Sequence, residues 1–246
     1  MNFKITVSLF IFLTQLFSSP VWSETNTSES EKVPMLDVYK LSYQEHEPGI
    51  DTYEVTMLVS DRFLRIDESG EDTGYIIYDD KIKTIFSVSH FDKRILVIKE
   101  QPFSIKQLNV LSTVEYLPLS DAPTISGKPL FNYRIFTGKG VEEKTCAQLQ
   151  VAKGLLPKVA SLLKKYQRVI SGQQVKMLDN TIKEVQTPCY LVDQIYNEGL
   201  YYDKGLPIQE WHSNEKSKRL VDYKKVKVKA TVFDLPTGYE KFSILK

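Results

Sequence analysis

Residues 53–60, YEVTMLVS, decide the fold class of this sequence. The side chains at positions 53, 55, 57 and 59 are aromatic or aliphatic, and their neighbours include Glu54, Thr56 and Ser60. Alternation with a period of two residues is typical of a β-strand that buries one face. The stretch therefore predicts a strand whose apolar side chains point into a core.

Similar strand patterns lie on both sides of this stretch. Short turns separate them, as at Ser60-Asp61 and between positions 68 and 74. Strands joined by short polar turns form an antiparallel meander. The expected strands are 39–43, 53–59, 63–67, 75–78, 82–88, 95–98, 131–135, 208–213, 219–223 and 226–232.

The middle of the chain changes to a helical period. Apolar residues from Leu155 to Ile170 recur at steps of three and four residues, and lysines fall on the other side. This pattern predicts an amphipathic helix. Pro157 suits its first turn, and Gly172 suits its end.

A second helix is expected to begin at Thr187-Pro188, a cap followed by a first-turn proline, and to stop at Gly199. A short helix is also expected near residues 104–111. Strands followed by helices and again by strands predict an α+β fold.

Composition excludes several classes of protein. The chain has 246 residues, 42% of them hydrophobic, which is too many for a disordered protein. It carries 32 Lys and Arg against 31 Asp and Glu, a formal net charge of +1. This balance lacks the basic signature of a nucleic-acid-binding protein, so no nucleic-acid partner is expected.

Residues 1–23 have the pattern of a secretory signal peptide. Lys4 precedes an apolar run from Ile5 to Phe17, and small residues before position 24 predict cleavage between Ser23 and Glu24. A transmembrane anchor is the alternative, but the run is too short to span a bilayer. We expect export to the periplasm or the medium, a flexible leader at 24–34, and a single domain at 35–246. No later segment approaches 18 apolar residues, so an integral membrane protein is not expected.

The two cysteines, Cys146 and Cys189, are interpreted in the light of this expected export. Oxidising compartments favour disulfides, and a single pair leaves no ambiguity of connectivity. The bond would close a loop of about 43 residues and contribute about 4 kcal/mol in the chain-entropy model. Two buried free thiols are the alternative.

Residues that could perform catalysis do not form a recognisable motif. His46, His90 and His212 are far apart and lack the spacing of a metal site. The adjacent pair Asp79-Asp80 lies on a turn and would point apart, which makes a poor acid–base pair. The sequence therefore predicts a protein that is not an enzyme and uses no metal or other cofactor.

One local concentration of charge occurs near the end of the chain. Lys225, Lys227 and Lys229 alternate with Val226, Val228 and Ala230, so one face of the expected strand is basic and the other apolar. A solvated outer sheet face, with lysines protecting an edge, is one interpretation. Contact with an anionic partner is the other.

The sequence combines an exported strand meander, a helical middle and a returning β-hairpin with five short motifs, Phe63–Asp67, Tyr75–Asp79, His90–Lys93, Gly205–Ile208 and Val232–Tyr239. The order of elements resembles the LolA-like group, which includes periplasmic lipoprotein carriers and the sensor domain of RseB-type regulators. The short motifs resemble exported proteins of the DUF4412 type. The resemblance implies a half-barrel, a curved antiparallel sheet whose concave face is covered by helices and can hold an acyl chain. The helical, disulfide-linked region at about 144–200 departs from the carrier pattern.

Two hypotheses about function follow. The first is a binding or carrier module for a lipid or a lipidated, hydrophobic ligand held between sheet and helices. The second is an envelope interaction or sensor protein with a packed core, which contacts a protein partner through the basic hairpin. Aromatic residues, 11% of the chain, suit either a packed core or a lipophilic cavity.

Overall fold

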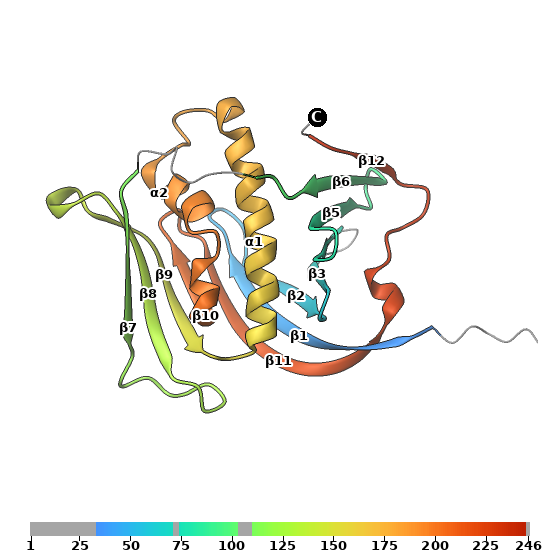
Figure 1. Ribbon diagram of the computed structural model, residues 1–246, viewed down its shortest axis with the longest axis horizontal. Helices are drawn as coiled ribbons and strands as arrows, with labels where there is room; N and C mark the ends of the chain where they lie inside the picture. Colours follow the sequence, from blue (N-terminus) through green and yellow to red (C-terminus); the bar gives the residue numbers. More distant parts are fainter. Residues whose placement is uncertain (1–32, 71–73, 103–109, 245–246) are drawn as a thin grey trace, which may run out of the picture. The chain divides into compact units, whose positions relative to one another are not determined.

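A curved sheet of twelve strands dominates residues 33–70, 74–102 and 110–244, the parts of the chain that this computed structural model describes (Figure 1). The strand order is β12-β6-β5-β4-β3-β2-β1-β11-β10-β9-β8-β7, and the sheet does not close. The strands are β1 Met35–His46, β2 Tyr53–Val59, β3 Phe63–Glu68, β4 Tyr75–Asp79, β5 Thr84–Ser89, β6 Arg94–Lys99, β7 Ser112–Pro118, β8 Leu130–Thr137, β9 Lys144–Lys153, β10 Gly205–His212, β11 Ser217–Lys229 and β12 Glu240–Phe242.

The pairing of β1 with β11 joins the two halves of the sheet. The strands β1 to β6 form a meander, as the alternating pattern predicts, and β7 to β11 form a second one. All neighbours are antiparallel except β12, which lies parallel to β6. The α+β class and the curved sheet are thus confirmed, but a purely antiparallel sheet is wrong at this one edge.

Helix α1, Pro157–Met177, lies across the concave face of the sheet (Figure 1). Its buried residues Val159, Leu162 and Leu163 belong to one cluster with Leu41 and Met57 of the strands. Burying such side chains contributes about 1.5–3 kcal/mol each, which holds the helix on the sheet.

Helix α2, Pro188–Leu191, continues into a π-helical turn at Val192–Tyr196. Val192 packs with Leu149 of β9 in a second cluster over strands β7 to β9. The side chain of Thr187 accepts a hydrogen bond from the backbone N–H of Tyr190, so the expected cap is present.

The helical region is shorter than predicted at its start. Residues 144–153 form β9, and the helices begin only at Pro157. The expectation of a helical region from about 144 is wrong because the segment has a period of two. Ala147, Leu149 and Val151 are buried, with partly exposed glutamines between them.

Gly172 does not end the first helix, which continues to Met177. A glycine inside a helix costs about 1 kcal/mol relative to alanine. Here Val169, Ser171 and Gln173 are buried around it, and the Ser171 hydroxyl donates to the Gln194 carbonyl at 3.0 Å. These tertiary contacts stabilise the helix beyond Gly172 in spite of the low helix propensity of glycine.

Some expectations lie outside the described residues. These are the signal peptide at 1–23 with its cleavage site, most of the leader at 24–34, and most of the short helix near 104–111. Strand β7 was not predicted, because prolines interrupt residues 101–128. In the described part of the chain, no helix is both long and apolar enough to span a membrane.

Candidate binding groove at the start of helix α1

A tight turn brings the chain from β9 into helix α1. Gly154 and Leu156 both adopt left-handed backbone conformations there, with φ of 70° and 43°. The chain can therefore reverse within a few residues, and Pro157 then fixes the first helical turn. The first turn of α1 therefore lies over β1 and β2.

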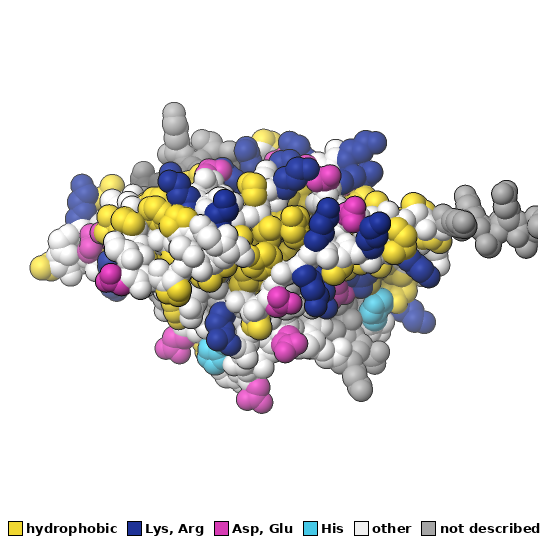
Figure 2. All heavy atoms as spheres, turned by 90° about the horizontal axis from the view of Figure 1, so that it is seen from below, with side chains coloured by type: hydrophobic (Ala, Val, Ile, Leu, Met, Phe, Trp, Pro, Cys, Tyr) yellow, Lys and Arg dark blue, Asp and Glu magenta, His cyan; other side chains and the backbone are white. Residues whose placement is uncertain are grey.

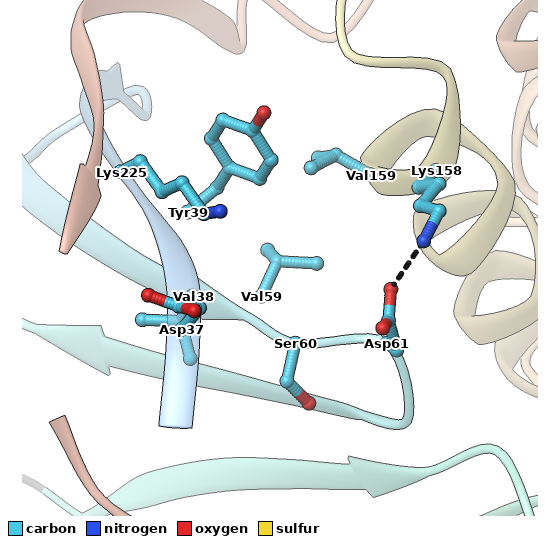
Figure 3. Close-up of a pocket in the computed structure, with 9 residues that line it drawn as sticks. All are labelled: Asp37, Val38, Tyr39, Val59, Ser60, Asp61, Lys158, Val159 and Lys225. Atoms are coloured by element: carbon cyan, nitrogen blue, oxygen red, sulfur yellow. Dashed lines mark hydrogen bonds and ion pairs between the residues drawn. The ribbon is translucent and has the colours of Figure 1, made fainter. Parts of the chain in front are cut away.

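A groove of about 350 Å3 opens at this point between the helix and the sheet (Figure 3). Tyr39 of β1, Val59 of β2 and Val159 of α1 supply its apolar surface (Figure 3). The other lining residues are Asp37, Val38, Ser60, Asp61, Lys158 and Lys225. The site is apolar at its floor and charged at its rim.

An ion pair crosses one end of the groove. Lys158 Nζ lies 3.0 Å from Asp61 Oδ1, and the two side chains are 80% and 83% exposed. Ion pairs in such exposed positions contribute about 0–1 kcal/mol, because water screens them and their side chains lose entropy. Lys158 is therefore available to another anion at little cost.

The lysines that the sequence singles out lie on the same side of the sheet as α1. On β11, Lys225 is opposite Tyr39 of β1, and Lys227 is opposite Asp37. Residues directly opposite each other in an antiparallel pair share a face. The alternation of exposed lysines with less exposed residues is confirmed, but the lysines protect no edge, because β11 lies inside the sheet between β1 and β10. Lys225 enters the groove lining, while Lys227 and Lys229 continue outward along the strand.

Among the described residues, the three lysines of the basic face make no ion pair, although Asp37 lies opposite Lys227 in the β1–β11 pair. Within the described ranges, no carboxylate lies within ion-pair distance of Lys225, Lys227 or Lys229, and all three are exposed. Seen from below the view of Figure 1, hydrophobic side chains gather across the middle of the molecule, with both basic and acidic side chains around them (Figure 2).

The predicted cysteine pair lies elsewhere, on β9 and α2. Cys146 and Cys189 form a disulfide with a Cα–Cα distance of 4.9 Å, and no described cysteine is free. Cys146 is completely buried. The bond fastens α2 to the strand that precedes α1, as expected, and it fits an oxidising compartment.

A histidine between two carboxylates forms a cluster that the sequence did not predict. His212 Nδ1 lies 2.8 Å from Asp193 Oδ2, and its Nε2 lies 3.6 Å from Glu210 Oε2. Burial disfavours the charged imidazolium, but the hydrogen bonds to Asp193 and Glu210 outweigh it and raise the pKa of His212 to about 10. The i, i+2 spacing of Glu210 and His212 on one strand was the available signal. The cluster joins the π-helical turn to β10.

The other histidines have separate environments. His90 meets Tyr239, with Nδ1 2.9 Å from the hydroxyl oxygen, and His46 ends β1. Asp79 is bound by Arg62, which lowers the pKa of that carboxyl, while Lys165 binds Asp80. In the described ranges, no group of three or more His, Cys, Asp or Glu side chains could hold a metal ion.

Four of the five segments that carry the resemblance to the LolA-like group lie together, while the fifth, Gly205–Ile208, lies in β10 of the other half of the sheet. Arg65 Nη1 donates to the Val232 carbonyl at 2.6 Å, and the Tyr75 hydroxyl donates to the Asp234 carbonyl at 3.1 Å. The rings of Phe63 and Phe233 stack with centroids 5.2 Å apart. These residues fasten the C-terminal segment 230–242 across β3 to β6, so their role is structural.

Comparisons with known proteins give little further information. The sequence matches no protein-family profile and no curated protein. Two crystal forms of PNGF-II, in space groups C2 and P21, are 12% and 10% identical to the chain, with TM-scores of 0.37 and 0.38. The similarity covers 84% and 85% of this chain but only 31% and 32% of PNGF-II, so the chain spans about a third of that protein's length.

Proposed function

We propose that the protein is a non-catalytic, exported binding module, periplasmic or secreted, whose ligand is amphipathic and anionic, such as a fatty acid or the lipid part of a lipidated molecule. The apolar part lies in the groove at the start of α1, and the acid group meets Lys225 and Lys158. The proposal rests on one observation: Lys225 lines the same groove as Tyr39, Val59 and Val159.

The chemistry of the groove favours such a ligand. Apolar surface gains about 25 cal/mol for each Å2 that a ligand removes from water. Lys225 and Lys158 can meet a carboxylate or phosphate while their stems cover apolar surface. The volume of about 350 Å3 lies at the lower end of the range for small-molecule pockets.

The groove, and not the centre of the sheet–helix interface, is the proposed site. Under α1, the side chains of Leu41, Leu64 and Leu163 are at most 3% exposed and pack in one cluster. A ligand there would have to displace packed side chains, which costs several kcal/mol. We therefore expect the ligand to bind beside the helix without moving it.

Titration with a fluorescent fatty acid tests this function. We expect saturable binding, and we expect Lys225→Glu to weaken it by about tenfold or more, because it places a second negative charge at the head group. Lys224→Glu is the matched control, since Lys224 is the neighbouring residue on the other face of β11. Absence of binding, or equal loss in both variants, contradicts the proposal.

A second function is favoured by the packed core and by Lys227 and Lys229, which lie outside the groove lining. This is an envelope interaction or sensor protein that contacts an acidic protein through the basic hairpin. Replacing Lys225, Lys227 and Lys229 with glutamine should then abolish recovery of a stoichiometric partner from envelope extract, while fatty-acid binding is absent. Loss of binding to anionic liposomes in the same variant would instead indicate a membrane contact.

A further inference from the structure

Strand β7 forms one edge of the sheet and pairs with β8 alone among the described strands (Figure 1). Its register with β8 is regular over all seven residues, with no bulge. Edge strands are usually protected by charged side chains, bulges or prolines, because their outer N–H and C=O groups can pair with another strand. In β7 the residues of this kind are Glu115, which Arg134 of β8 already binds, and the last residue, Pro118.

The exposed apolar residues of this edge are spaced symmetrically. Val114 is 51% exposed, Leu117 is 51% exposed and Leu111 is 59% exposed. Leu111 precedes the strand, and its carbonyl accepts a hydrogen bond from the Thr137 hydroxyl at 3.0 Å, which holds it beside β8. Leu111 and Leu117 therefore lie at equal distances in sequence on either side of Val114.

We infer that β7 is a dimerisation edge, which pairs antiparallel with β7 of a second copy about a two-fold axis at Val114. Each Leu111 then lies opposite Leu117 of the second copy, and the two Val114 side chains lie opposite each other. All three exposed apolar residues gain apolar partners in this single register.

Charge selects the same register. With the axis at Val114, Glu115 lies opposite Thr113 of the second copy. An axis at Glu115 would place two carboxylates opposite each other, which is destabilising. An axis at Tyr116 would place Leu117 opposite Glu115. Glu115 is already bound by Arg134, at 3.0 Å, so it needs no partner across the interface.

A second copy fits this edge better than an open chain of molecules. The other described edge, β12, has three residues and runs parallel to its neighbour, so it offers β7 little to pair with. Pairing of β7 with β7 is isologous and closes after two molecules. The groove at α1 is not part of this edge, so the inference does not depend on the proposed ligand.

Cysteine cross-linking tests the register in the full chain. Paired residues in antiparallel strands have Cα atoms about 4.5–5.5 Å apart, which is within reach of a disulfide. Val114→Cys should give a covalent dimer on mild oxidation, whereas Thr113→Cys alone should not. Mixing Thr113→Cys with Glu115→Cys should restore the cross-link. The native cysteines are paired with each other and do not interfere.

Light scattering on a concentration series tests the dimer itself. Val114→Lys should weaken dimerisation by about 100-fold, because it places two ammonium groups opposite each other. Val141→Lys is the control, since Val141 is fully exposed at the β8–β9 turn and outside the edge. A wild-type monomer at the highest attainable concentration overturns the inference. A dimer that persists in Val114→Lys also overturns it, as does cross-linking that shows no selectivity for Val114. If Val114→Lys fails to fold, the cross-linking experiment alone tests the inference.

Discussion

Lys225 lines the groove together with apolar side chains, so the groove offers both a positive charge and apolar surface. Lys225 faces Tyr39 across the β1–β11 pair, and Val159 approaches from the helix. The alternation of lysine and valine predicts the basic face of the strand. Which residues lie next to that face depends on the pairing of β1 with β11. These strands are far apart in the sequence, so the local pattern does not predict their pairing.

A half-buried histidine, His212, makes the stability of the protein depend on pH. The pKa of His212 is about 10 in the folded protein, above its ordinary value of 6.5, because Asp193 and Glu210 bind the charged ring. Such a group contributes stability fully below about pH 6.5 and loses it as the pH rises through about 10.

His212→Gln should therefore lower the free energy of unfolding on the order of 3 kcal/mol at pH 6 and by much less at pH 10. Urea denaturation of both proteins across this range measures the difference. Asn214→Ala, in the adjoining turn, is the control and should show no such trend. A wild-type minus His212→Gln difference that stays constant with pH would show that the ring is not held in its charged form.

At the scale of elements, the disulfide joins α2 to β9 and closes a loop with a sequence separation of 43 residues. Removing it with Cys146→Ala and Cys189→Ala should cost about 4 kcal/mol in the chain-entropy model. Urea denaturation of the double variant measures this loss, and reduction of the wild type should reproduce it. A loss below about 1 kcal/mol would mean that the packing of Val192 and Tyr196 holds α2 without the bond.

The C-terminal segment 230–242 depends on a few polar and aromatic contacts across β3 to β6. Arg65 binds Asp67 and the Val232 carbonyl, and its guanidinium lies 3.8 Å from the centre of the Tyr75 ring. Arg65→Ala should therefore speed hydrogen exchange in residues 230–242 by about tenfold, while α1 is unaffected. Arg219→Ala, which removes an exposed contact with Gln44, is the control. Unchanged exchange in the segment would show that Phe233 and β12 suffice to hold it.

Element types were predictable where one period dominates and were not where two signals compete. The meander from β1 to β6 and helix α1 follow from their periods of two and of three to four. The strand β9 was missed because it immediately precedes the helical pattern, although Leu149 and Val151 alternate with glutamines. Gly172 was assigned as a helix end because local propensity does not register the tertiary packing around it.

At the scale of the whole molecule, the order of strand and helix patterns predicts the α+β class, and the resemblance to the LolA-like group implies a curved sheet with helices on its concave face. The sequence does not predict that β11 pairs with β1 or that β12 runs parallel to β6. Nor does it predict that side chains pack closely between α1 and the sheet. These features depend on long-range pairing and on side-chain volumes. The groove exists only because the β9–α1 turn sets the start of the helix above β1 and β2, so no single segment encodes it.

Methyl NMR during titration with dodecanoate tests whether the groove at the start of α1 holds an amphipathic anion. We predict that the methyl resonances of Val59 and Val159 shift in a saturable way, and that Lys225→Glu weakens this response while Lys224→Glu does not. Valines of the α2 half, such as Val192, should be unaffected. Resonances of Val59 and Val159 that do not move, or shifts that spread equally to Val192, would show that the groove does not hold the ligand.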